Sequence, residues 1–258
     1  MIFNEDYVEV NQKQIAIRSV GPTHGKPLLL LHGWLDNSAS FKPLCRFQQE
    51  YLPGYQLINI EWSGHGASQH KSQDSYYHFV DWVYDLLQLI EIKQWDKVDI
   101  VGHSMGGMVA TAFTSAFPEK VNKLITIEAF GFVTTNPEDT RTQLRSGLQS
   151  RLNARTKSLK RHNKFSSAVL ARKSVSDLDY ENAQLLVERG IEHLEDGFQW
   201  RSDPKLKLIS PIRLTPQQAA NLLESLSVPM MVIYGEQAFD FVQQNLHEHA
   251  NLVKWLTT

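Results

Sequence analysis

Apolar residues recur along the chain in two alternating patterns. The continuous apolar run at 27–31 is typical of a strand that is covered on both faces, and 56–60 predicts the next buried strand. Between them, residues 41–51 and 76–92 place apolar side chains every three or four positions, which predicts helices. Further apolar runs at 98–103 and 123–127 continue the alternation, and two short alternating stretches at 7–10 and 14–20 precede it. We therefore predict an α/β fold with a mostly parallel, twisted sheet and helices on both faces.

This alternation breaks between residues 134 and 214. Leu144, Leu148 and Leu152 recur at four-residue spacing, and a second helical stripe runs over 180–194, before a stretch at 197–201 that could be extended. Residues 140–173 contain ten Lys or Arg and no Asp or Glu, which suits either a solvated helix face or a lid that attracts anions. We expect a core domain formed by residues 1–133 and 215–258, with a helical cap or lid insertion at 134–214.

The sheet pattern resumes after this insertion. Residues 230–234 predict a strand, 239–250 a helix and 251–256 a last strand, after which two residues remain.

Composition limits the class of protein and its partners but does not identify a substrate. The formal net charge of −2 gives no reason to expect nucleic acid, and one cysteine, Cys45, allows no internal disulfide. The first ten residues lack the features of a signal peptide, and no apolar run approaches the roughly 20 residues of a membrane span. No Cys/His cluster or phosphate loop implies a metal or an organic cofactor. We expect a cytoplasmic protein that acts on a small molecule and does not insert into a membrane. The sequence predicts no particular oligomeric state.

The motif that carries chemistry is Gly-His-Ser-Met-Gly at 102–106. A β-branched run precedes it and a small-residue helix pattern follows it, so it fits a sharp strand-to-helix turn that lifts Ser104 clear of the backbone. Other polar and glycine-rich segments follow neighbouring strands, at 32–34, 61–68 and 128–130. Because ligands bind at the carboxyl ends of parallel strands, these segments predict a site at one sheet edge.

The order of these segments resembles the α/β-hydrolase superfamily over nearly the whole chain. The resemblance rests on His32-Gly33-Trp34, on Glu61-X-X-Gly64-His65-Gly66-X-Ser68 and on the glycine-flanked motif at 102–107. Narrower similarity to the serine hydrolase-like branch lies in 197–204 and 210–215. The resemblance implies an α/β-hydrolase fold and a nucleophile at Ser104.

An acyl-transfer serine needs donors for the oxyanion that forms during attack. The turn geometry offers the backbone N–H of Met105, and the loop after His32 and Gly33 offers that of Trp34. The side chains of Met105 and Trp34 could simply line the pocket. Those of His32 and His103 could form local hydrogen bonds that shape their turns. His65 is expected to be structural. Glu61 stands where the family usually has Asp and is expected to brace its loop.

Two carboxylates compete for the acid position that the resemblance implies. Glu128 follows an earlier strand, where some branches of the superfamily place the acid. Asp240 follows the strand at 230–234, two residues beyond the usual position, which Ala238 occupies. Either carboxylate could instead be a surface or capping group.

The resemblance places the catalytic histidine on a loop after the last strand, where only Thr257 and Thr258 remain. It therefore implies that the C-terminal end of the fold is missing from this sequence. His247 and His249 precede that strand, near the end of a helix of twelve residues that covers roughly 18 Å, so both are expected to lie far from Ser104.

Three interpretations stay open. The sequence could be a shortened serine hydrolase that cleaves esters or related acyl compounds, a non-catalytic relative that binds a small ligand, or an enzyme whose base is His32 or His65.

Overall fold

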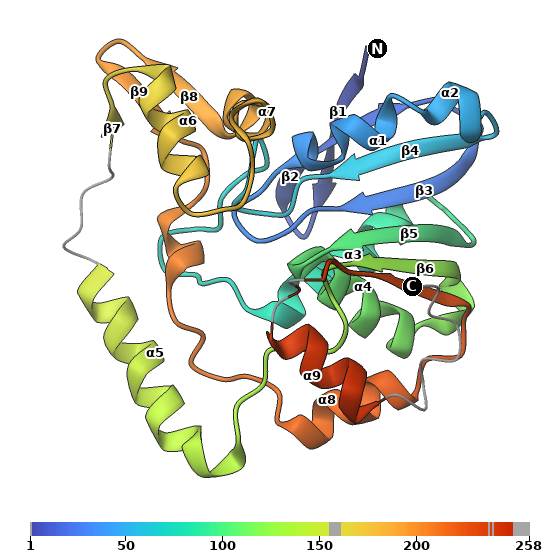
Figure 1. Cartoon of the computed structure of the whole chain (residues 1–258), viewed down its shortest axis with the longest axis vertical. Helices are drawn as coiled ribbons and strands as arrows, with labels where there is room; N and C mark the ends of the chain where they lie inside the picture. Colours follow the sequence, from blue (N-terminus) through green and yellow to red (C-terminus); the bar gives the residue numbers. More distant parts are fainter. Residues whose placement is uncertain (1, 155–160, 237, 239, 250–258) are drawn as a thin grey trace.

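The computed structural model describes residues 2–154, 161–236, 238 and 240–249. A seven-stranded sheet in the order β1-β2-β4-β3-β5-β6-β10 forms its centre (Figure 1). Five strands are parallel: β4 (Tyr55–Ile60), β3 (Lys26–Leu31), β5 (Val98–His103), β6 (Val121–Ile127) and β10 (Met230–Ile233). At one edge, β1 (Asn4–Val10) and β2 (Lys13–Val20) are antiparallel. The predicted mostly parallel α/β sheet is confirmed.

The two faces of the sheet bury alternate residues of the same strands. In β3, Leu29 and Leu31 pack into the cluster that contains residues of α3 (Phe79–Ile92) and α4 (Met105–Ala116). Leu28 and Leu30 pack on the opposite face, where α1 (Lys42–Cys45) contributes Cys45. This explains the continuous apolar run of β3, since a strand with two covered faces has no solvated positions.

A third cluster extends the first face past β10. It joins α4 to α8 (Pro216–Glu224) and α9 (Asp240–Glu248) through buried residues that include Leu223 and Val242. The last strand expected at 251–256 lies outside the described residues. No helix within the described ranges combines the length and apolar character needed to cross a membrane.

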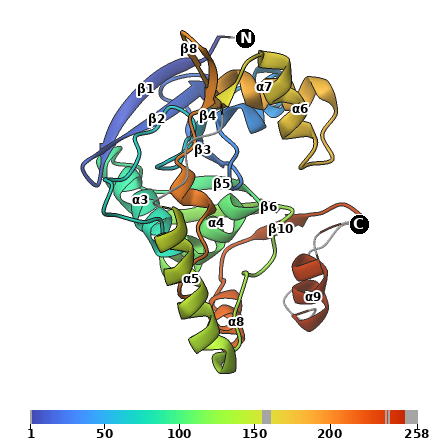
Figure 2. The ribbon, with the colours of Figure 1, turned by 90° about the vertical axis from the view of Figure 1, so that its left-hand side faces the viewer.

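The chain between β6 and β10 forms a separate group of elements. These are α5 (Thr140–Ala154), β7 (Arg161–His162), α6 (Phe165–Lys173), α7 (Tyr180–Gly190), β8 (Ile191–Leu194), β9 (Gly197–Trp200) and the short helix η4 (Pro204–Lys207). A small sheet in the order β7-β9-β8 lies beside α6 and α7, while α5 extends along the outside of the molecule (Figures 1 and 2). The division into a core at 1–133 and 215–258 and a lid at 134–214 stays a prediction.

Two predicted helices were wrong in their extent. Residues 41–51 form two four-residue helices, α1 and α2 (Gln48–Tyr51), and not one continuous helix. The second helical stripe stops at Gly190, and residues 191–194 form β8, which pairs with β9. A Cβ at Gly190 would lie 3.0 Å from the side-chain amide nitrogen of Asn37. The helix therefore ends in close contact with the loop after β3, and periodicity does not reveal this contact.

Candidate active site

Ser104 lies at the turn between β5 and α4. Its φ of 48° and ψ of −118° are unfavourable for a residue with a side chain, and such strain is retained only where surrounding contacts enforce it. Its N–H donates to the carbonyl of Ile127 at 2.9 Å, which ties the turn to the end of β6. The structure therefore forms the strained strand-to-helix turn predicted from the motif.

The glycines of the motif permit a backbone approach that no other residue allows. A Cβ at Gly106 would lie 2.1 Å from the carbonyl oxygen of Leu31, at the end of β3. One at Gly107 would lie 2.6 Å from the Cβ of Ala129. The first turn of α4 is thus pressed directly onto the ends of the neighbouring strands, as the spacing of the glycines requires.

The loop after β3 lies against this turn. A Cβ at Gly33 would lie 3.3 Å from the Cβ of Ser104 and 2.9 Å from Nδ1 of His103. Met105 is the first residue of α4, where helix N–H groups have no partner within the helix. The structure therefore brings together Ser104, Gly33 and the backbone segments that carry the N–H groups of Trp34 and Met105.

The side chain of Trp34 points to the chain between β6 and β10. Its indole Nε1 donates to the carbonyl of Leu206 in η4 at 3.0 Å. Other η4 residues, Pro204 and Lys207, line a cavity of about 720 Å³ between α5 and residues 199–209. Trp34 thus links the loop beside Ser104 to one wall of this cavity, although neither Ser104 nor Trp34 lines it.

The two candidate acids have different surroundings. Glu128 directly follows β6 with a φ of 51°, and its carboxylate accepts the N–H of Gly235 at 2.5 Å. Asp240 is exposed in the first turn of α9. Glu128 also lies close enough to His103 to act on its pKa, which burial lowers and the carboxylates of Asp36 and Glu128 raise in part. The structure places Glu128 at the edge that holds Ser104.

A charged group beside Ser104 was not predicted. Asp36 is buried in the loop after β3, and its carboxylate accepts a hydrogen bond from Nη2 of Arg172 at 2.7 Å. Its other oxygen lies 3.7 Å from Nδ1 of His103. Arg172 belongs to α6, so this group ties the loop beside Ser104 to the chain between β6 and β10.

His32 and His65 are fully buried and are held by local contacts. Nδ1 of His32 lies 2.8 Å from the carbonyl of Gly33, and its Nε2 accepts the N–H of Trp62 at 3.1 Å. His65 packs its ring against His32, with centroids 5.1 Å apart. Burial lowers the pKa of both imidazoles, that of His65 strongly. Nε2 of His65 has no hydrogen-bond partner among the described residues, and no hydrogen bond of the described part joins either ring to Ser104.

His247 and His249 lie at the far end of α9. The helix begins after β10, at the carboxyl edge, and runs back from it (Figure 1). His247 is in its last turn, and His249 follows it. This agrees with the expectation that neither histidine reaches Ser104.

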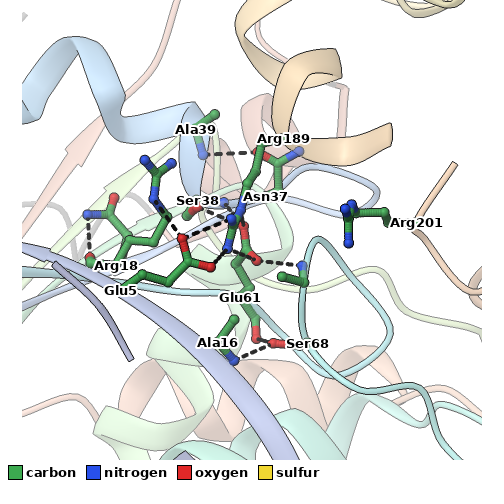
Figure 3. A network of polar contacts seen from close by, with 12 residues as sticks. Glu5, Ala16, Arg18, Asn37, Ser38, Ala39, Glu61, Ser68, Arg189 and Arg201 are labelled. Carbon is green, nitrogen blue, oxygen red and sulfur yellow. Dashed lines mark hydrogen bonds and ion pairs between the residues drawn. The ribbon is translucent and has the colours of Figure 1, made fainter. Parts of the chain in front are cut away.

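Glu61 is a fully buried carboxylate with a complete set of partners (Figure 3). It accepts hydrogen bonds from the N–H and Oγ of Ser38 at 3.0 and 2.7 Å, and from the N–H of Ala67 at 2.7 Å. Arg189 of α7 adds a bidentate pair at 2.9 and 3.0 Å, and its guanidinium also binds Glu5. Glu61 thus braces its loop, as expected, and also anchors α7.

Arg189 and burial have opposite effects on the pKa of Glu61. Burial by itself raises the pKa of this carboxyl, but the hydrogen bonds and charge of Arg189, with the donors of Ala67 and Ser38, hold it below its ordinary value of 4.5. Glu61 is therefore ionised at neutral pH and belongs to the framework of the site.

Comparison with known proteins agrees with this geometry. Residues 26–237 match the family model described as the alpha/beta hydrolase fold. The chain belongs to the α/β-hydrolase family.

Relatives of this α/β-hydrolase carry the name serine hydrolase-like protein. The one from Danio rerio is 31% identical over 224 residues, which covers 84% of this chain and 67% of the relative. Serine hydrolase-like protein 2 from Homo sapiens is 28% identical and covers 92% and 77%. The crystal structure of a hypothetical protein from Pseudomonas aeruginosa has a TM-score of 0.88 and 30% identity, over 96% of this chain and 87% of that one. The predicted resemblance to this branch is confirmed.

Sequence reasoning missed three residues around the site of this hydrolase: Asp36, Arg172 and Arg189. Asp36 follows His32 by four positions in the same loop, which was a usable signal. Arg172 is one of the ten cations at 140–173, but nothing in their spacing distinguishes the one that pairs with Asp36. Within the described residues, no grouping of three or more His, Cys, Asp or Glu is arranged to hold a metal ion.

We expect Arg189→Met to lower the free energy of unfolding by about 3–5 kcal/mol, because it leaves the buried carboxylate of Glu61 without its cation. The double variant E61Q/R189M should lose less than the two single variants added together, because the pair is removed as a unit. Urea denaturation measures all three. The matched control is Arg161→Met, which removes an exposed pair with Asp196 worth about 1 kcal/mol or less. An equal cost for both arginines would contradict the anchoring role of Arg189.

We also expect stability to fall as the pH drops below 6.5. The unfolded chain protonates His32 and His65 near their ordinary pKa of 6.5, whereas the folded chain holds both pKa values lower. The unfolded state thus binds more protons in this window, which costs up to about 1.4 kcal/mol per pH unit for each histidine. Urea denaturation at several pH values measures the slope.

The variant His65→Gln should make this slope shallower. His24→Gln, at an exposed position after β2, is the matched control and should keep the slope of the unmodified protein. A slope that is unchanged in His65→Gln would show that the buried imidazole is not its source. The contribution of Glu61 is separable, because it is complete above pH 4.5 and is lost only as the pH falls from there through its lower folded-state pKa.

Proposed function

We propose that this α/β-hydrolase is a serine hydrolase that cleaves ester-type or related acyl substrates through an acyl-enzyme on Ser104. The observation that carries the proposal is the strained turn that holds Ser104 against the loop of Gly33. A strained backbone at this position has a cost that a purely structural serine does not require. The serine hydrolase-like relatives support the same reaction class.

The reaction begins when Oγ of Ser104 attacks the acyl carbonyl carbon and loses its proton to a general base, which the family resemblance places after the last strand, outside the described residues. The electron pair of the carbonyl moves to its oxygen, and the N–H groups of Trp34 and Met105 stabilise that oxyanion. When the tetrahedral intermediate collapses, the alcohol leaves with a proton and the acyl group stays on Ser104. Water then attacks the acyl-enzyme and releases the acid.

We assign the acid member of the site to Glu128. Its positive φ and its hydrogen bond to Gly235 hold the carboxylate at the edge that contains Ser104. Asp240 is the weaker candidate, because it is exposed at the start of α9. Gly33 has no side chain, and those of His32 and Trp34 have no proton-transfer role in this proposal, since this segment supplies the backbone donor and the shape of the loop.

The second candidate function is a non-catalytic protein that binds a small ligand at the same edge. The burial of His32 and His65 favours it, because neither imidazole bonds to Ser104 within the described residues. The two functions differ in one measurable property, the nucleophilicity of Ser104.

We expect a fluorophosphonate probe to label Ser104 covalently and p-nitrophenyl acetate to be hydrolysed. Ser104→Ala should abolish both reactions, while Ser225→Ala, at an exposed site after α8, should retain them. Mass spectrometry of the labelled peptide identifies the modified residue. Labelling that survives in Ser104→Ala, or no labelling of the unmodified protein, would contradict the proposed reaction and favour the binding protein.

The same assay tests the loop beside Ser104. Gly33→Ala places a methyl group 2.9 Å from Nδ1 of His103 and should slow labelling by about 10²-fold, the effect of losing one oxyanion donor. Gly54→Ala is the matched control, since a Cβ there meets nothing within 4 Å. Equal rates in the two variants would remove the loop from the proposed site.

A further inference from the structure

Helix α5 packs against the protein with its polar and small residues. Gly147 is its buried residue, and a Cβ there would lie 2.5 Å from Cα of Pro211. On the same side, Gln143 donates to the carbonyl of Ser210, and Oγ of Ser150 accepts the N–H of Ile209 at 3.2 Å. The guanidinium of Arg151 lies over the ring of Tyr76, 3.9 Å from its centroid. These contacts fix the rotation of the helix.

That rotation leaves the leucines of α5 in solvent. Leu144, Leu148 and Leu152 are 42%, 51% and 60% exposed, and their four-residue spacing places them along one stripe of the helix. Most surface helices turn such a stripe toward the core. Here the stripe faces outward, on a helix that lies along the outside of the molecule in both views (Figures 1 and 2).

Positive charge surrounds the leucine stripe. Arg141 and Arg145 are exposed and lie three positions before Leu144 and Leu148, so they lie next to the stripe, and Arg145 also borders the cavity between α5 and residues 199–209. Glu138 and Asp139 precede the helix, but the sequence from 140 to 173 holds ten cations and no acid. The whole chain has a formal charge of −2, so this positive charge is local.

We propose that the exposed face of α5, formed by Leu144, Leu148, Leu152, Arg141 and Arg145, binds the surface of an anionic lipid bilayer. An amphipathic helix with basic residues beside its apolar stripe lies in the plane of the interface, with the stripe among the acyl chains and the cations at the headgroups. The fifteen residues of α5 give a contact of roughly 22 Å along the helix axis.

Charge complementarity selects this occupant over a second copy of the chain. A symmetric contact would pair this face with the same face of α5 in the other copy, which carries further arginines and no acid to compensate Arg141 and Arg145. Repulsion between like charges across such an interface opposes the dimer. An anionic bilayer offers negative charge and an apolar layer together, which are the two properties that the helix face requires.

The test is cosedimentation of the full chain with vesicles of phosphatidylcholine alone, or of phosphatidylcholine mixed with phosphatidylglycerol. The protein should bind the anionic vesicles, bind the neutral ones far less, and dissociate as salt is added. R141Q/R145Q should weaken binding by about 25-fold, since each basic residue near an anionic surface contributes about fivefold. The matched control K26Q/K97Q, at exposed lysines elsewhere, should change binding by less than about twofold.

The leucines are tested separately. L144S/L148S/L152S should weaken binding by at least about 100-fold, because it removes the apolar stripe. Val80→Ser is the control, since Val80 is 64% exposed on α3. The single variant Leu148→Ser, checked by circular dichroism, keeps the test valid if the triple variant does not fold. Ser104→Ala should bind like the unmodified protein, so this result is independent of the proposed hydrolase.

Three outcomes would overturn the proposal. One is the absence of binding to anionic vesicles, and another is equal binding to both vesicle types. The third is a dimer in solution that Leu148→Ser dissociates while vesicle binding is unaffected, which would assign the stripe to a second copy of the chain.

Discussion

The close contact between the first turn of α4 and the end of β3 is the constraint on which the site depends. Because Gly106 has no side chain, its backbone lies against the carbonyl of Leu31, and Ser104, two positions earlier, takes a conformation that side chains avoid. The strain at Ser104 is thus maintained by packing over the whole sheet edge. The same contact brings the loop of Gly33 beside Ser104, so that the nucleophile and the proposed oxyanion donors have one common origin.

Buried charge connects this edge to the chain between β6 and β10. Arg189 binds Glu61 and Arg172 binds Asp36, and both carboxylates lie in loops at the carboxyl ends of core strands. Each pair therefore joins an element of the predicted lid to a loop of the core. Such pairs are costly to break by removing one partner, which makes them suited to hold a lid in one orientation. The outer helix α5, in contrast, is held through its polar side and leaves its leucines free for another surface.

The sequence could predict the parts of this structure that depend on local backbone geometry. The turn at Ser104 and the parallel sheet follow from glycine spacing and from continuous apolar runs, which act within a few residues. The partners of Glu61 and Asp36 could not be predicted, because Arg189 and Arg172 are 128 and 136 positions away. The helix predicted over 41–51 failed for a related reason, since its periodicity did not reveal the break between α1 and α2. Outward exposure of the α5 stripe is likewise a tertiary property.

The central claim is that Ser104, Trp34 and Met105 form one site that stabilises an acyl-transfer intermediate. A crystal structure of the protein after reaction with a phosphonate inhibitor tests it most directly, because the phosphonyl oxygen stands in for the oxyanion. Our account predicts phosphorus bonded to Oγ of Ser104 and its oxygen about 2.7–3.1 Å from the backbone nitrogens of Trp34 and Met105. An adduct whose oxygen points away from both nitrogens, or a modified residue other than Ser104, would contradict it.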